Sequence, residues 1–183
     1  MASAEDDVRK IGNGRDLKED QKALLENTIK ESRRSAREAL DKALLLKQDY
    51  AAANYWTALL LQAEGKGDEA TAKLESVRNG SPNDLGVGFQ LAILYYQNKQ
   101  TDKAIAELRR LIGLEAQYSN ARWYLAAMLE EKGDLDDAIG QIEEVLKANP
   151  GNADVQKRLD DLKAKKAGAT APTEDGLPEP VKP

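Results

Sequence analysis

The 183-residue sequence contains neither cysteine nor histidine. Without cysteine there can be no disulfide, no zinc–thiolate site and no cysteine nucleophile. Without histidine the chain lacks the commonest general base and the commonest side-chain ligand of transition metals. These two absences exclude most familiar catalytic and metal centres.

An excess of positive charge is also missing, since 27 lysines and arginines stand against 32 acidic residues and the net charge is −5. A protein that binds nucleic acid usually presents a basic face to the phosphates, so we expect no nucleic-acid partner. The compact basic cluster around Arg33 and Arg34 is interleaved with Glu31 and Glu38. That pattern is typical of a solvated helix face with i,i+4 ion pairs.

Long apolar runs are absent as well, and none approaches the roughly 18 residues that a membrane span requires. The first ten residues, MASAEDDVRK, lack the hydrophobic core of a signal peptide. We therefore expect no membrane insertion and a soluble protein, cytoplasmic by default.

What the sequence does contain is a repeat with a period of 34 residues. Aligned segments start at Arg34, Asp68, Asp102 and Asp136. Each carries an alanine, an aliphatic residue four places on and a small or aliphatic residue three places further: Ala36, Leu40, Ala43; Ala70, Leu74, Val77; Ala104, Leu108, Leu111; Ala138, Ile142, Val145. The i, i+4, i+7 spacing predicts amphipathic helices with one buried face, and the alanine lets a neighbouring helix approach closely.

A second helical segment precedes three of these repeats, starting at Ala51, Leu85 and Ser119. The intervening turns are Glu64–Asp68, Asn98–Asp102 and Lys132–Asp136. Glycine or asparagine in each turn is expected to take the left-handed conformation, and the aspartate to cap the next helix or favour its positive end. Pro82 and Pro150 mark the exits of two second helices, because proline cannot continue a helix.

A 34-residue helix–turn–helix period with these small, large and proline places resembles the tetratricopeptide repeat (TPR). The resemblance implies an all-α, TPR-type α-solenoid of antiparallel helix pairs, with repeats at 51–84, 85–118 and 119–152. The sequence departs from the family consensus at some positions. LAILYY and LAAMLE carry alanine where glycine is usual, and Ala116 replaces the proline of the middle repeat.

The two ends are predicted to differ. Residues 153–167 place Val155, Leu159 and Leu162 on one face, as expected of a helix that caps a solenoid. Residues 168–183 are rich in proline, glycine and threonine and are predicted to be a disordered tail, while 1–15 are predicted to be a flexible lead-in.

Residues 16–50 leave two interpretations open, one long helix or a degenerate half repeat that breaks near Glu31–Arg33. No glycine or proline occurs from residue 16 to 48, which favours the long helix. In either case we expect its second half to pack like the second helix of a repeat.

No enzyme, cofactor or metal site is expected. Acidic doublets such as Glu143-Glu144 do not converge on one site, because neighbouring side chains on a helix point about 100° apart. The aspartates around Gly133 lack the spacing of a calcium loop, and GKGD at Gly65–Asp68 lacks the frame of a phosphate-binding loop.

The TPR resemblance implies a concave groove, lined by the first helices, that holds extended peptides or helices. Carried onto this sequence, the groove-facing places are Tyr55, Leu59, Gln62, Phe89, Ile93, Tyr96, Trp123, Ala127 and Glu130. Each repeat leads with an aromatic residue, a plausible row of interface anchors. The competing interpretation is that these aromatic residues are core; Trp56 and Tyr124, one place further round, are expected to be core.

Heat-shock co-chaperones that resemble this fold bind an acidic C-terminal carboxylate through lysine, arginine and asparagine, but the matching places here are apolar. The sequence therefore favours a protein-interaction scaffold that binds an apolar or amphipathic segment of a partner, laid in the groove. The alternative is a self-assembling structural protein whose partner is another copy of itself. The resemblance also suggests a bacterial protein, with a soluble domain of a cell-envelope protein as the alternative setting.

Overall fold

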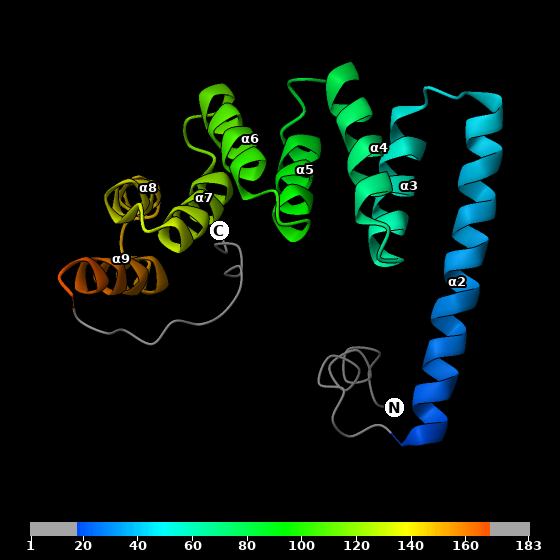
Figure 1. Cartoon of the computed structure of the whole chain (residues 1–183), viewed down its shortest axis with the longest axis horizontal. Coiled ribbons are helices and arrows are strands. Elements are labelled where there is room, and N and C mark those ends of the chain that lie inside the picture. The colour runs from blue at the N-terminus through cyan, green and yellow to red at the C-terminus, as the bar shows by residue number, and fades with distance from the viewer. Residues whose placement is uncertain (1–17, 169–183) are drawn as a thin grey trace. The chain divides into compact units, whose positions relative to one another are not determined.

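The computed structural model describes residues 18–168, and within them it has eight helices and no strand (Figure 1). The helices are α2 (Glu19–Leu46), α3 (Ala51–Ala63), α4 (Gly67–Gly80), α5 (Leu85–Gln97), α6 (Thr101–Leu114), α7 (Ser119–Lys132), α8 (Leu135–Ala148) and α9 (Ala153–Lys166). The expected lead-in at 1–15 and the tail after Gly168 lie outside the described residues. The chain divides into two compact units, residues 1–53 and 54–183.

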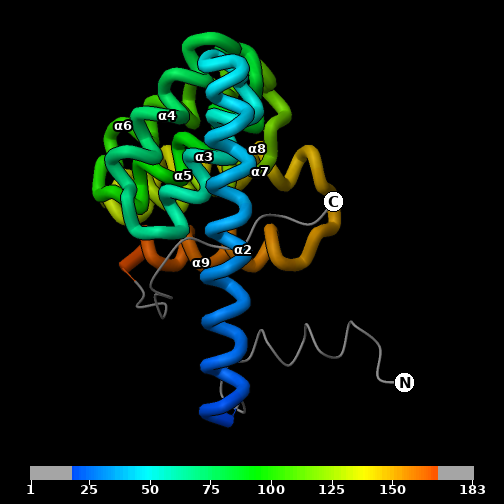
Figure 2. Tube along the Cα trace, turned by 90° about the vertical axis from the view of Figure 1, so that its right-hand side faces the viewer, coloured from blue at the N-terminus to red at the C-terminus, as the bar shows by residue number. Residues whose placement is uncertain are grey.

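The first unit contains α2, which Figure 2 shows as one uninterrupted helix. Of the two interpretations left open by the sequence, the structure therefore has the single helix. The prediction that its second half packs like the second helix of a repeat stays a prediction. The chain does not turn near Glu31–Arg33, so the stripe of Ala36 and Leu40 has no preceding first helix of its own repeat to pack on.

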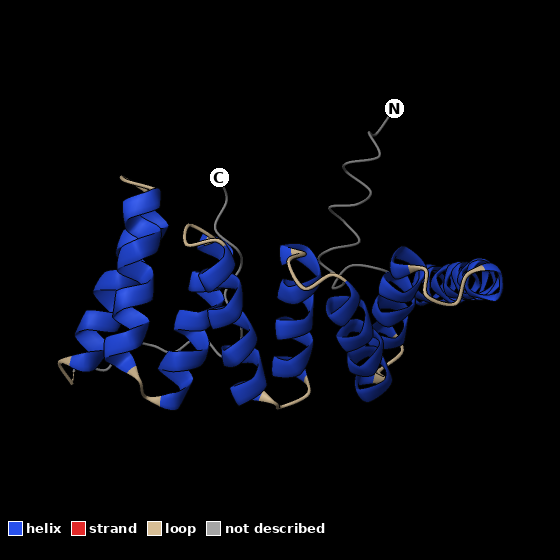
Figure 3. Ribbon diagram, turned by 90° about the horizontal axis from the view of Figure 1, so that it is seen from above, coloured by secondary structure: helices blue, strands red, loops and turns tan. Residues whose placement is uncertain are grey.

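The second unit is built from the helix pairs α3–α4, α5–α6 and α7–α8, followed by α9. Figure 3 shows the paired helices lying side by side and joined by short loops. The predicted buried stripe is confirmed in α4, α6 and α8, where every member is at most 7% exposed: Ala70, Leu74, Val77, Ala104, Leu108, Leu111, Ala138, Ile142 and Val145. This stripe is the common element on which the three pairs are built.

The last helix, α9, packs as a further first helix would. Its buried residues Val155, Leu159 and Leu162 fall 34 places after residues of α7 that are buried as well. Asn152 caps the start of the helix, because its side-chain oxygen accepts hydrogen bonds from two backbone N–H groups, those of Asp154 and Val155. The remaining surface of α9 is mostly charged, as suits the end of a repeat array.

The turns inside the pairs follow the prediction in two places out of three. Gly65 (φ 76°) and Gly133 (φ 85°) take the left-handed conformation. In the middle turn the left-handed residue is Lys99 (φ 61°), not Asn98 as glycine–asparagine preference suggested. Asn98 has a different role, since its side-chain amide donates a hydrogen bond to Thr71 Oγ1 in the preceding pair.

The expected aspartate caps are also placed differently. The first turns of α4, α6 and α8 contain Asp68, Asp102 and Asp136, whose negative charges interact favourably with the positive end of the helix dipole. None of these three helices has a side-chain hydrogen bond at its N-cap. The aspartate that does cap a helix is Asp84, whose carboxylate accepts from the backbone N–H of Val87 at the start of α5.

At Gly88 the backbone of α5 lies against side chains of α6. A methyl group there would lie 2.6 Å from Leu111 Cδ2 and 3.0 Å from Glu107 Oε1. Glu107 is itself buried and ion-paired to Arg110 at 2.6 Å, and Arg110 also donates to the carbonyl oxygen of Pro82 in the connection before α5. The missing side chain at residue 88 thus leaves room for this ion pair within α6, and the hydrogen bond from Arg110 to Pro82 joins α6 to the connection after the preceding helix pair.

We predict that Gly88→Ala destabilises the protein, because overpacking costs about 1–3 kcal/mol, more than the roughly 0.5–1 kcal/mol gained by replacing a helical glycine. Gly140→Ala in α8 is the matched control, since nothing lies within 4 Å of its added methyl group, and it should raise stability. Urea unfolding followed by circular dichroism measures both. Equal changes in the two variants would contradict the tight contact at Gly88.

Candidate partner-binding face

The candidate site is the set of nine residues predicted to face the groove, here named the first-helix row. Helices α3, α5 and α7 each supply three members at i, i+4, i+7 spacing, so each trio shares one side of its helix. Most members are half-buried: Tyr55, Leu59, Gln62, Phe89, Ile93, Tyr96 and Glu130. Trp123 and Ala127 are covered more completely, at 8% and 5% exposure.

The aromatic members of the row have unequal surroundings. Phe89 lies against two rings, Tyr118 at the N-cap of α7 with centroids 5.7 Å apart and Tyr124 within α7 in an edge contact at 5.2 Å. Tyr55 meets Trp56 edge-on at 5.6 Å. Aromatic packing therefore links α5 to α7, and the rings contribute to both the core and the surface.

The prediction that Trp56 is core is wrong, because 58% of it is exposed. Tyr124, at the equivalent position two repeats later, is covered by Phe89 of the preceding first helix. Trp56 lies in the first of the three repeats, and its ring contact is with the neighbouring Tyr55 of the same helix.

The last member of each trio is joined to the next first helix by a hydrogen bond between residues 35 positions apart. Gln62 donates to Gln97, the Tyr96 hydroxyl donates to Glu131, and Lys165 of α9 donates to Glu130 at 3.0 Å. We name these three bonds the cross-repeat ladder. The ladder ties one end of each first helix to its neighbour, α9 included.

Two further contacts strengthen the ladder. Gln90 donates to Gln62 Oε1 at 3.1 Å, and Arg158 forms a second ion pair with Glu130. Glu130, whose side chain is 14% exposed, is therefore neutralised by two cations of α9. The sequence prediction placed Gln62, Tyr96 and Glu130 in the row but missed these bonds; the signal was a second polar residue directly after the row position, at Gln97 and Glu131.

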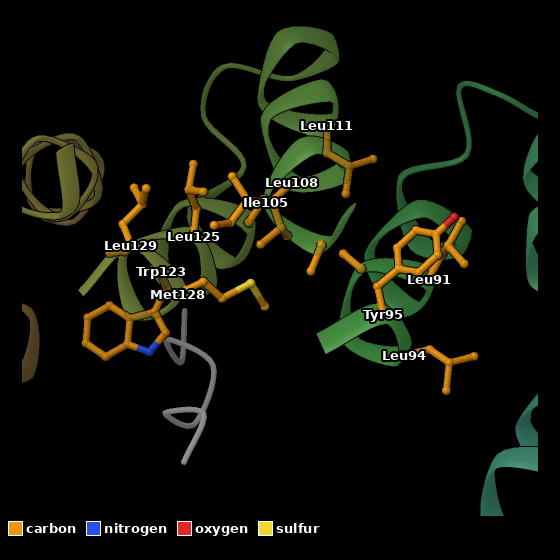
Figure 4. Packing of buried hydrophobic residues seen from close by; sticks show 14 of the residues in the cluster. Leu91, Leu94, Tyr95, Ile105, Leu108, Leu111, Trp123, Leu125, Met128 and Leu129 are labelled. Carbon is orange, nitrogen blue, oxygen red and sulfur yellow. The ribbon is translucent and has the colours of Figure 1, made fainter. Parts of the chain in front are cut away.

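One donor in the row has no acceptor. Among residues 18–168, the Trp123 indole Nε1 is buried without a hydrogen-bond partner. Figure 4 shows the indole on the side of α7 opposite to Leu125 and Leu129, with its nitrogen turned away from both. A buried donor left unpaired costs about 1–3 kcal/mol. Because the nitrogen is itself covered in the structure, the indole must move before this N–H can bond with a bound molecule.

The ladder also changes the ionisation of the Tyr96 hydroxyl. Burial, and then the hydrogen bond to Glu131 and its charge, raise the pKa of Tyr96 to about 12. A tyrosine in the unfolded chain ionises near pH 10, about two units lower. The folded state therefore holds the phenolic proton more tightly, and the stability gained is complete below pH 10 and lost as the pH rises from 10 to 12.

We predict that the urea midpoint of the wild type falls between pH 10 and 12 and that Tyr96→Phe reduces this fall. Tyr50→Phe is the control, since Tyr50 is 48% exposed and outside the ladder, and its midpoint should track that of the wild type. Parallel curves for wild type and Tyr96→Phe would show that the tyrosine–glutamate bond does not form in solution.

Comparison with known proteins identifies the repeats. Residues 89–153 match the family model described as tetratricopeptide repeat. The helix pairs within residues 89–153 are tetratricopeptide repeats. The whole fold agrees, because many solved structures match the chain and those most similar are TPR solenoids. No curated protein sequence matches the chain significantly.

Three of the similar solved structures show the range of sequence identity and coverage. MamA is 18% identical, with 83% of this chain and 86% of MamA covered and a TM-score of 0.65. YrrB, described as a TPR protein with an unusual peptide-binding site, is 25% identical, with 79% and 74% covered and a TM-score of 0.62. The Yersinia enterocolitica type III secretion chaperone SycD, in complex with a peptide of the translocator YopD, is 18% identical, with 62% and 92% covered and a TM-score of 0.55. Likenesses at this identity establish the TPR fold.

None of the helices within residues 18–168 combines the length and apolar character that crossing a membrane requires.

Proposed function

We propose that this TPR protein is a protein-interaction scaffold whose first-helix row binds an apolar or amphipathic segment of a partner protein. The observation that carries the proposal is the buried Trp123 N–H, a donor without an acceptor among the described residues, set in the row where the repeat pattern predicts partner contacts. Peptide binding by YrrB and SycD supports the same use of the fold.

The chemistry of the row indicates the kind of segment. Tyr55, Leu59, Phe89 and Ile93 are half-buried and uncharged, so they can bury more apolar area when a ligand covers them. The charged member, Glu130, is already paired with Arg158 and Lys165. A row without unpaired charge favours apolar side chains over an acidic terminus.

The Trp123 N–H adds a requirement for an acceptor. A backbone carbonyl oxygen of the bound segment is the acceptor available in any peptide sequence, and the bond would fix how the segment lies along α7. The first-helix row and the Trp123 N–H together fit a peptide that presents apolar side chains at intervals along its length and one free backbone carbonyl group.

To test the proposal, a random peptide library is selected against the wild-type chain and the affinities of the best peptides are measured by fluorescence anisotropy. We expect apolar or amphipathic peptides, and at least a tenfold loss of affinity, about 1.4 kcal/mol, in a Leu59→Ser/Ile93→Ser variant. Trp123→Phe, which removes only the donor and part of the ring, should weaken binding about 3- to 10-fold, as expected for one hydrogen bond.

The matched control is Ala72→Ser/Ala106→Ser, which changes two exposed positions on the second helices α4 and α6. It should bind the selected peptides as the wild type does, and circular dichroism should show that all variants keep their helices. Peptides that bind the row variant and the wild type equally well would overturn the proposal.

A further inference from the structure

Helix α2 is the part of the structure whose apolar residues have the least cover. It spans 28 residues, none of them buried, and its aliphatic side chains Leu24, Ile29, Leu45 and Leu46 are between 40% and 90% exposed. Helices in proteins gain most of their stability by packing an amphipathic face. A face of this length therefore calls for a partner.

The apolar and small residues of α2 form a heptad seam. They alternate at intervals of four and three residues: Leu25, Ile29, Ser32, Ala36, Ala39, Ala43 and Leu46. This is the spacing at which two helices pack in a coiled coil. The charged pairs Arg34–Glu31 and Arg34–Glu38 lie on the opposite side of the helix, as a solvated outer face requires.

The seam remains accessible in the structure. Ile29, Ala36, Ala39 and Leu46 are exposed, and Leu25 and Ala43 are half-buried. Partly covered side chains of the same helix, such as Leu44, lie about a quarter-turn round the helix from the seam, given about 3.6 residues per turn.

Side-chain sizes along the seam determine how two copies fit. Large residues occupy its N-terminal half and alanines most of its C-terminal half. In an antiparallel pair the outer layers combine one of each, Leu25 with Ala43 of the second copy and Ile29 with Ala39, while the central layer pairs the small residues Ser32 and Ala36. A parallel pair would place Leu25 and Ile29 against themselves and alanine against alanine, so the distance between the helices could not be uniform.

Charge gives the same orientation. In the same register an antiparallel pair brings Glu19 beside Lys47 of the second copy, and the two-fold symmetry repeats this attraction. A parallel pair would bring Lys42 beside Lys47, a repulsion that also occurs twice. Size and charge are both self-complementary, so a second copy of the chain is the occupant that the seam fits.

We propose that α2 is a dimerisation helix, which packs antiparallel against α2 of a second copy of this chain. The pairing uses none of the first-helix row and is independent of the proposed function. Because alanines bury little area, the interface is at the small end of the range for stable complexes, and the dimer should dissociate on dilution.

The absence of cysteine from the chain allows a direct test. Full-length Ile29→Cys and Ala39→Cys variants, one carrying a size tag, are oxidised separately and as a mixture, and covalent dimers are resolved by mass spectrometry. Both positions are exposed, so folding should be unaffected, which circular dichroism checks. Ala72→Cys on α4 supplies the background of random collisions.

The proposal predicts a mixed Ile29→Cys/Ala39→Cys dimer well above the Ala72→Cys background, with each variant alone remaining at background. It also predicts that light scattering shows dimer in the wild type at high concentration and monomer in Ala36→Glu. Cross-linking of each variant with itself would establish a parallel pair and overturn the proposal. Background levels in every mixture would overturn it as well.

Discussion

The structure depends on the close packing of one small and two larger side chains on each second helix. In α4, α6 and α8 this trio begins with an alanine that is fully buried: Ala70, Ala104 and Ala138. An alanine lets a neighbouring helix approach to a distance that a larger residue would prevent. The 34-residue period repeats that approach, so the first helices are held at regular intervals. Everything described for the first-helix row follows from this spacing.

Regular spacing makes cross-repeat contacts possible between residues that are far apart in the sequence. The cross-repeat ladder joins residues 35 positions apart, and Phe89 contacts Tyr124 in the next first helix. These contacts satisfy most polar groups of the row, while the Trp123 N–H is buried without a partner among the described residues. The row is the surface that we propose for a partner segment, and the seam of α2 that we propose for dimerisation uses none of its residues.

Much of the fold could be predicted because the period and the buried stripe depend on residues within one helix pair. The choice between Asn98 and Lys99 for the left-handed position was harder to predict. Lys99 takes it, and the Asn98 side chain bonds to Thr71 in another repeat. Trp56 was expected to be core because it lies one place round the helix from the groove position, but coverage depends on a neighbour such as Phe89, which a single repeat does not reveal. The positions of the row were predicted, while the bonds of Gln62, Tyr96 and Glu130 required three-dimensional spacing. Whether the row binds a partner stays a prediction.

The most direct test of this account is to change the small residue itself, by comparing Ala104→Leu with Ala106→Leu. Both lie on α6, but Ala104 is fully buried and Ala106 is exposed. Residue-level amide hydrogen exchange, with urea unfolding, measures the effect. The account predicts that Ala104→Leu costs about 1–3 kcal/mol through overpacking and speeds exchange in α5, α6 and α7, while Ala106→Leu changes little. Equal stability and unchanged exchange in the two variants would contradict the claim that helix approach at this alanine holds the repeats in register.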